Sequence, residues 1–175
     1  MRPLNLAHQL IKDVLTADDL AIDATCGNGH DTLFLAQRAR HVYAFDIQPS
    51  AMASTRTRLA EHNLAHRVTL INSCHSHMSD IMSQRSNVKA AMFNLGYLPG
   101  SDKSIITTPE TTIMALNTCL ELLATGGLIT IMVYPRHDGG RAEADAILTW
   151  SRNHNATIYG DQHDLHPFLI TIKKR

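Results

Sequence analysis

The sequence predicts an α/β protein built on a doubly wound, mostly parallel seven-stranded sheet with an antiparallel last strand. Short apolar runs recur along the chain, and segments with helical spacing of apolar residues lie between most of them. This alternation is typical of a parallel sheet covered by helices on both faces. Only residues 162–167 separate the last two runs, too few for a parallel crossover, so these runs should form an antiparallel hairpin at one edge.

Each expected element follows from its local pattern. The first helix covers 5–15, where Leu6, Leu10 and Val14 form one apolar stripe. The runs expected to be strands are, in chain order, LAIDAT, HVYAFDI, RVTLINS, VKAAMFNLGY, GLITIMVYP, ATIYGD and PFLITIKK. The later helical segments are 32–39, 49–62, 109–123 and 141–154. We expect the glycines of ATGG, residues 124–127, to cap the helix before the fifth strand, because glycine readily takes the positive φ found at helix ends.

Composition narrows the class of protein. The 175 residues are 44% hydrophobic, enough for residues 1–175 to form one domain. Three cysteines without a CxxC pair argue against a disulfide framework and a structural zinc site. The N-terminus lacks a signal-peptide pattern and no run approaches a membrane span, so we expect a cytoplasmic protein without a membrane partner. The 16 basic and 16 acidic residues balance, so the protein has no net positive charge that would attract nucleic acid. The sequence does not fix the oligomeric state, and a homodimer is compatible with it.

The stretch AIDATCGNGHDT has the form of a ligand-binding loop between a strand and a helix. Gly27 and Gly29 fit a tight turn in which the backbone approaches a ligand closely. A dinucleotide fingerprint would carry glycine or alanine where Thr32 stands. Asp23 ends the apolar run; its carboxylate would repel a pyrophosphate but could neutralise the amino group or sulfonium region of S-adenosylmethionine. The loop therefore favours S-adenosylmethionine over NAD.

Two further strand ends supply candidate cofactor contacts. Asp46 ends the second apolar run, where a carboxylate can accept hydrogen bonds from both ribose hydroxyls of an adenosine. Cys74 and His75 follow the third run, at the place that lines an adenine pocket in this kind of fold. His75 and His77 could instead bind a metal or lie in a surface loop; no third ligand accompanies them, so we expect no metal. Cys26 is expected to be a small buried filler.

The fourth run leads into candidate catalytic residues. Asn94 to Tyr97, NLGY, is similar to the N-P-P-Y motif of amino-methylating enzymes, with Leu-Gly in place of the prolines. The Asn94 amide oxygen can accept hydrogen bonds from a substrate amine, and Tyr97 can stack on a base; a strand-end cap is the plain alternative for Asn94. An alkyl amine must also lose a proton, for which the candidate acceptors are Asp102, Tyr134 and His137. His137 is preferred because histidine titrates near neutral pH, although each of the three also fits an ordinary turn, strand-end or loop role.

Four motifs together resemble one family. DATCGNGHDT, FDIQ, FNLGYLPGSDKSIITTPETT and GGLITIMVYPRHDGG are similar to motifs of the YtqB/MnmM-type methyltransferases, labelled "putative rRNA methylases". The resemblance implies a class I methyltransferase, a Rossmann-like fold, that uses S-adenosylmethionine to methylate the amine of 5-aminomethyl-2-thiouridine at the tRNA wobble position. It also implies cofactor contacts at Asn28, Asp31, Asp46, Gln48 and His75. The chain departs from the family pattern at Ser76, where an acid is expected, and at Arg136, where a glycine is expected.

We therefore predict a cytoplasmic methyltransferase that modifies tRNA and binds the anticodon region of this substrate. The alternatives are a methyltransferase acting on an rRNA base or a small-molecule amine, a nicotinamide-dependent oxidoreductase, and a non-catalytic binding module. Asp23 and Thr32 disfavour the oxidoreductase, and the NLGY segment beside an intact glycine loop disfavours the binding module. Basic residues available to meet RNA phosphates are Arg2, His8, Lys103, Arg136, Arg141 and the tail Lys173, Lys174 and Arg175.

Overall fold

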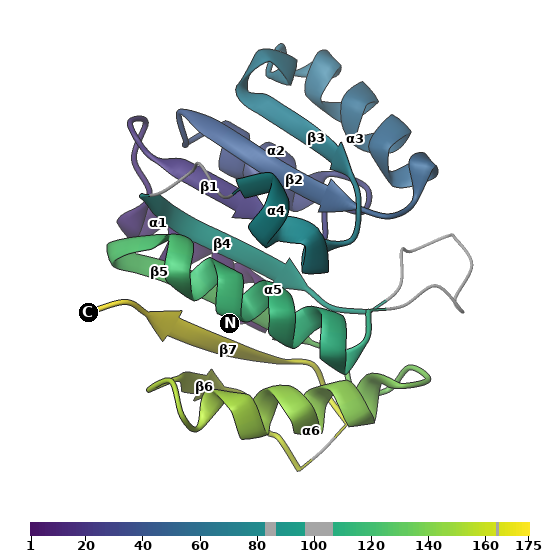
Figure 1. Ribbon diagram of the computed structural model, residues 1–175, viewed down its shortest axis with the longest axis vertical. Helices are drawn as coiled ribbons and strands as arrows, with labels where there is room; N and C mark the ends of the chain where they lie inside the picture. The colour runs from purple at the N-terminus through teal and green to yellow at the C-terminus, as the bar shows by residue number, and fades with distance from the viewer. Residues whose placement is uncertain (83–86, 97–106, 164) are drawn as a thin grey trace.

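A computed structural model of the chain shows a seven-stranded sheet with helices on both faces (Figure 1). It describes residues 1–82, 87–96, 107–163 and 165–175. The strands are β1 Leu20–Asp23, β2 His41–Asp46, β3 Val68–Asn72, β4 Val88–Asn94, β5 Leu123–Val133, β6 Thr157–Tyr159 and β7 Phe168–Lys173. The helices are α1 Pro3–Val14, α2 His30–Ala36, α3 Pro49–Glu61, α4 Met78–Met82, α5 Pro109–Leu122 and α6 Gly140–Ser151, with short 3₁₀ turns η1 Ala65–Arg67 and η2 His75–His77.

The strand order, β3-β2-β1-β4-β5-β7-β6, confirms the predicted doubly wound sheet. Strands β1 to β5 pair in parallel, and β7 pairs antiparallel with both β5 and β6. The last hairpin is therefore antiparallel and at one edge, as the short connection requires. The order reverses between β1 and β4, and in such sheets ligands bind beyond the carboxyl ends of the strands at this point.

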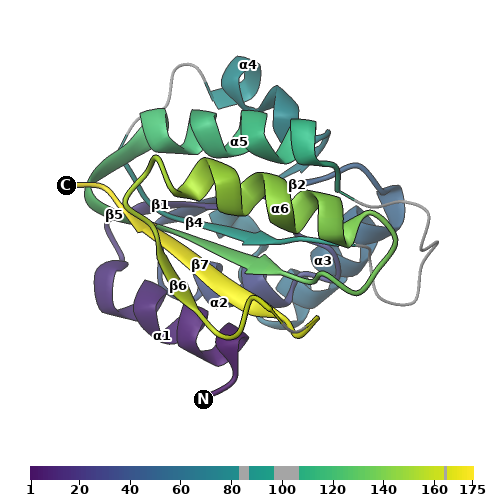
Figure 2. The ribbon, with the colours of Figure 1, turned by 90° about the horizontal axis from the view of Figure 1, so that it is seen from below.

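Helices α1, α2 and α3 cover one face of the sheet and α4, α5 and α6 cover the other (Figure 2). Each face has its own buried apolar cluster. Ile11 of α1 and Leu35 of α2 pack in one cluster, and Leu116 of α5 and Ile147 of α6 pack in the other. Among the described helices, none is both long and apolar enough to cross a membrane.

One expected boundary is wrong. Helix α5 ends at Leu122 and the next residue is already extended, so residues 124–127 belong to β5 rather than to a glycine cap. Val88 pairs with Leu123 and Ala90 pairs with Leu128, so the glycines lie in an irregular part of the strand. Gly126 has a φ of 75° and its N–H donates to the Lys174 carbonyl. The positive φ that suits a helix end here serves a bulge between strands.

Candidate cofactor and substrate site

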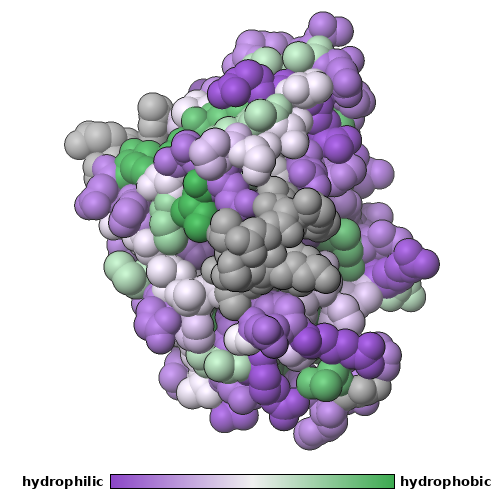
Figure 3. All heavy atoms as spheres, turned by 90° about the vertical axis from the view of Figure 1, so that its right-hand side faces the viewer, coloured by the Kyte–Doolittle hydropathy of each residue, from purple (hydrophilic) through white to green (hydrophobic). Residues whose placement is uncertain are grey.

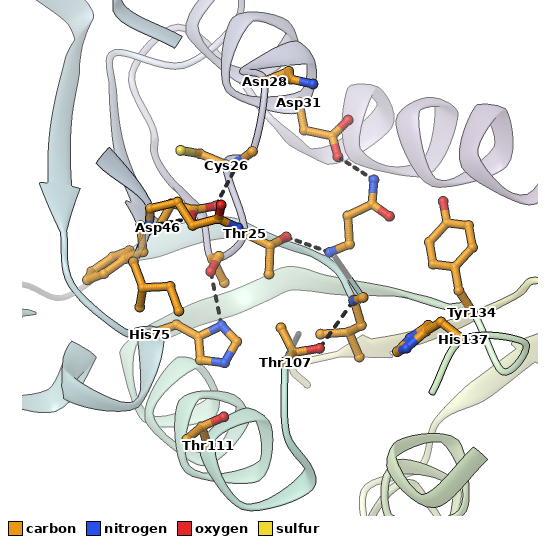
Figure 4. Close-up of a pocket in the computed structure, with 18 of the residues that line it drawn as sticks. Thr25, Cys26, Asn28, Asp31, Asp46, His75, Thr107, Thr111, Tyr134 and His137 are labelled. Atoms are coloured by element: carbon orange, nitrogen blue, oxygen red, sulfur yellow. Dashed lines mark hydrogen bonds between the residues drawn. The ribbon is translucent and has the colours of Figure 1, made fainter. Parts of the chain in front are cut away.

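A cavity of about 1220 Å³ lies at the carboxyl edge of the parallel strands. Its walls come from the ends of β1 to β5 and the segments that follow them, together with the start of α1 and residues just before β7. Asp31, Asp46, His75 and Tyr134 surround a common space in the close-up (Figure 4). Figure 3 shows the face of the molecule toward which the carboxyl ends of the parallel strands point. Over the described residues of this face, hydrophobic side chains form small patches among hydrophilic ones. The site suits a ligand that carries both polar and apolar groups.

The turn after β1 requires its two glycines. Gly27 and Gly29 have φ values of 53° and 83°, and a Cβ on Gly29 would lie 2.9 Å from the Thr55 Cα. The Cys26 N–H donates to the Phe45 carbonyl at 2.9 Å, which ties the turn to β2. Cys26 is 4% exposed, as expected for a filler, and burial raises the pKa of its thiol. The turn thus places Gly27 in the cavity wall, while Gly29 supports it from behind.

Asp46 sits at the end of β2 with its carboxylate held by the backbone. Its Oδ2 accepts from the Gly27 N–H and its Oδ1 accepts from the Gln48 N–H, both at 3.0 Å. Asp46, Gln48 and Asn28 all line the cavity. A carboxylate oxygen can accept more than one hydrogen bond. Asp46 can therefore hold the glycine turn and still accept from a ligand hydroxyl.

Asp23 differs from its expected placement. Its side chain is fully buried, and neither Asp23 nor Thr32 is in the cavity wall. The carboxylate accepts from the Thr32 hydroxyl at 2.6 Å and from the Thr25 N–H at 3.2 Å. Burial and the nearby Asp31 charge raise the pKa of Asp23 to about 7. In this structure Asp23 organises the turn from inside the protein, and Asp31 is the acid of this loop that reaches the cavity.

Asp23→Asn should flatten the dependence of stability on pH. The native state holds the Asp23 proton up to a pKa of about 7, whereas the unfolded chain releases it near 3.8. Between these values the unfolded state binds fewer protons, so the free energy of unfolding falls as pH rises, by at most about 1.4 kcal/mol per pH unit from this group. Denaturant titrations at about pH 5, 6 and 7 should show a smaller fall for the variant. Parallel curves for the two proteins would contradict this role.

His75 and Cys74 form another part of the wall. His75 is 5% exposed, and burial lowers the pKa of its imidazole, which favours the neutral ring. Its Nδ1 lies 3.0 Å from the Ala24 carbonyl oxygen, so Nδ1 carries the hydrogen and Nε2 is left as an acceptor. His77 instead contacts Ser73, so the two histidines do not converge. The described part of the chain contains no group of three or more side chains suited to holding a metal.

A chain of polar contacts crosses the cavity at the carboxyl end of β4. The Asn94 N–H donates to the Thr25 hydroxyl at 2.7 Å, and Asn94 Nδ2 lies 3.5 Å from Asp31 Oδ2. Asp31 Oδ1 lies 2.6 Å from His8 Nε2. Tyr134 also lines the cavity; burial, followed by the Asp31 charge, raises the pKa of the Tyr134 phenol, while Asn94 opposes the rise. The contact with Asp31 orients the Asn94 amide, and the raised pKa favours the protonated phenol of Tyr134.

His137 lines the cavity next to Tyr134 (Figure 4), whereas Glu143 is buried outside the cavity wall. His137 Nδ1 contacts the Asp138 carbonyl at 2.9 Å, and its Nε2 is buried. Glu143 is 1% exposed and accepts from the hydroxyls of Thr107 and Thr112, each at 2.8 Å. Burial raises the pKa of Glu143, while the two hydroxyls and His137 oppose the rise. Sequence reasoning missed Glu143, because an acid on an amphipathic helix usually faces solvent.

The remaining predicted residues are dispersed. Tyr97, Asp102 and Lys103 lie outside the described residues. Arg136 and His8 line the cavity. The basic tail lies at the opposite end of the strands, because Lys173 pairs with Leu128, the first residue of β5 that pairs with β7. Of the basic residues available to meet RNA phosphates, Arg136 and His8 therefore lie at the site, and the tail does not flank it.

Comparison with known proteins identifies the family. Residues 42–161 match the family described as "Putative rRNA methylase". The chain is 42% identical over 153 residues to the chloroplastic tRNA (mnm(5)s(2)U34)-methyltransferase of Arabidopsis thaliana. That alignment covers 81% of this chain but only 56% of the Arabidopsis protein, so the chain matches little more than half of that relative.

Two solved structures superpose over the whole chain. One is an rRNA methylase family member from Clostridium thermocellum, with 40% identity and a TM-score of 0.94, covering 100% of this chain and 98% of the other. The second is a methyltransferase family member from Streptococcus mutans in complex with SAH, with 40% identity and a TM-score of 0.90, covering 100% and 99%. The fold is that of class I S-adenosylmethionine-dependent methyltransferases, and the chain belongs to the rRNA methylase family.

Proposed function

We propose that the protein is an S-adenosylmethionine-dependent N-methyltransferase that methylates the amine of 5-aminomethyl-2-thiouridine at the tRNA wobble position. The observation that carries this proposal is the Asn94–Asp31–Tyr134 cluster beside the glycine turn, in a chain 42% identical to a tRNA (mnm(5)s(2)U34)-methyltransferase. Residues 1–175 would act as one domain. The free thiols of Cys26, Cys74 and Cys119 suit a reducing compartment such as the cytoplasm.

The residues of the cavity wall fit this cofactor. Asp46 would accept from the ribose hydroxyls, and the neutral His75 together with Cys74 would lie along the adenine. Asn28 and Asp31 stand where the amino acid part would bind, beyond the glycine turn. When bound, S-adenosylmethionine supplies an electrophilic methyl group on a positively charged sulfur. An acid wall at Asp31 and Asp46 is compatible with that positive charge.

Asn94 would position the attacking nitrogen. Because its Nδ2 faces Asp31, the amide presents Oδ1 as an acceptor for a substrate N–H. Methyl transfer from a sulfonium is an in-line displacement by a neutral nucleophile, so orientation and exclusion of water supply most of the acceleration. Tyr134, with its raised pKa, would form hydrogen bonds from the cavity wall rather than act as a base.

Nucleoside mass spectrometry provides the test of substrate. tRNA containing 5-aminomethyl-2-thiouridine is incubated with the protein and S-adenosylmethionine, and the digest should show conversion of that nucleoside to its N-methyl form. Reactions without cofactor and reactions with rRNA serve as controls. Methylation of rRNA alone, or of a free amine alone, would replace the proposed substrate while keeping the methyltransferase activity.

A further inference from the structure

The proposed reaction requires a proton acceptor in the cavity. An alkyl amine is mostly protonated at neutral pH, and an ammonium has no lone pair with which to attack. Burial and the Asp31 charge raise the pKa of Tyr134, which disfavours the phenolate as a resting base. His137 lines the cavity, but its Nδ1 contacts the Asp138 carbonyl and its Nε2 is buried. A second histidine, His8, lines the same cavity and contacts the Asn94–Asp31 pair directly.

His8 enters the cavity from α1, and the sequence offered it only as a phosphate contact. Its Nε2 lies 2.6 Å from Asp31 Oδ1, and the same carboxylate reaches Asn94 through Oδ2. A carboxylate accepts hydrogen bonds but does not donate them, so Nε2 carries the hydrogen and Nδ1 holds the lone pair. The His8 side chain is 29% exposed, whereas that of Asp31 is 9% exposed. His8 thus connects the polar cluster to solvent.

Packing fixes the His8 ring. It stacks on Phe34 with centroids 4.1 Å apart and planes 8° from parallel. The Arg38 guanidinium carbon lies 4.1 Å from the centroid of the same ring, so His8 and Arg38 must occupy opposite faces of Phe34. A ring held on one face by stacking and at one edge by a carboxylate is preorganised, as a catalytic base must be.

We propose that His8 is the proton acceptor for the substrate ammonium, and that Asp31 is the residue that positions it. This inference rests on the proposed function. His8 Nδ1 takes a proton from the ammonium, directly or through one water, and the C–NH₃⁺ group becomes a neutral amine. The amine nitrogen then forms a bond to the methyl carbon as the sulfur–methyl bond breaks and its electron pair returns to sulfur. Asp31 keeps the Nε2–H hydrogen bond throughout, and the His8 imidazolium returns its Nδ1 proton to water.

Replacing His8 with glutamine tests the role directly. His8→Gln keeps an N–H donor for Asp31 but has no basic nitrogen. At pH 7 single-turnover methylation of 5-aminomethyl-2-thiouridine tRNA should fall by about 100-fold, the scale for general-base catalysis. The deficit should shrink as pH rises toward about 9.5, because the amine then loses its proton to water. Affinity for S-adenosylhomocysteine should stay within about 2-fold. His66→Gln, which changes an exposed histidine outside the cavity wall, is the matched control.

The readout is the ratio of the wild-type rate to the His8→Gln rate at each pH. This ratio is used because other groups also titrate, and they affect both proteins alike. The charged and titratable groups near the His8–Asp31 pair include Arg38 just after α2, Asp23 on β1, Tyr134 after β5 and Lys12 on α1, and both proteins retain them. Equal rates at pH 7, or a loss that is the same at every pH, would overturn the role of His8 while leaving the proposed function intact. A wild-type protein that methylates no amine would remove the proposed function and the proton acceptor together.

Discussion

Asn94→Ala is expected to reduce the turnover number by about 100-fold or more while changing the affinity for S-adenosylhomocysteine by less than about 3-fold. The Asn94 side chain contacts Asp31 at the cavity wall, whereas the hydrogen bond from the Asn94 backbone N–H to the Thr25 hydroxyl survives the substitution. Loss of an orienting contact can cost about 100-fold in rate through misplacement of the nucleophile. Steady-state kinetics and calorimetry separate the two effects.

The control for this experiment is Asn153→Ala, which removes an exposed asparagine outside the cavity wall. It should leave both turnover and affinity unchanged. If Asn94→Ala loses turnover and cofactor affinity to the same extent, Asn94 is a binding residue and takes no separate part in orienting the amine.

Asp46→Ala is expected to weaken S-adenosylhomocysteine binding by about 10-fold to 100-fold, or about 1.5 to 3 kcal/mol, the scale for a lost charged hydrogen-bond partner. The loss has two sources. The ribose hydroxyls lose their acceptor, and the N–H groups of Gly27 and Gln48 lose theirs, so the turn is also less well held. Isothermal calorimetry measures the change.

Asp18→Ala, which truncates an exposed acid in the turn before β1, is the matched control for charge. Binding that is unchanged in Asp46→Ala would show that the carboxylate serves only the backbone of the turn. The same titration with NAD in place of S-adenosylhomocysteine should show no binding, and the reverse preference would contradict the assignment of the cofactor.

The fold was predictable because its signals are local. The alternation of apolar runs and helical segments specified the parallel strands, and the short 162–167 connection specified the antiparallel hairpin. The glycines at 124–127 misled because positive φ is needed both at helix ends and in strand bulges. A single sequence indicates that a residue adopts a positive φ, but not whether that residue lies at a helix end or in a strand bulge.

Within the site, the glycine turn and the acid at the end of β2 could be predicted from the sequence alone, since spacing along a strand–turn–helix unit places both. Which acid of AIDATCGNGHDT reaches the cavity depends instead on the packing of distant segments. Asp23 is enclosed by its neighbours, whereas Asp31, in the first turn of α2, meets His8 of α1 and Asn94 of β4. Those partners come from distant segments, and their convergence depends on how helices pack on the two faces of the sheet, which no local pattern encodes.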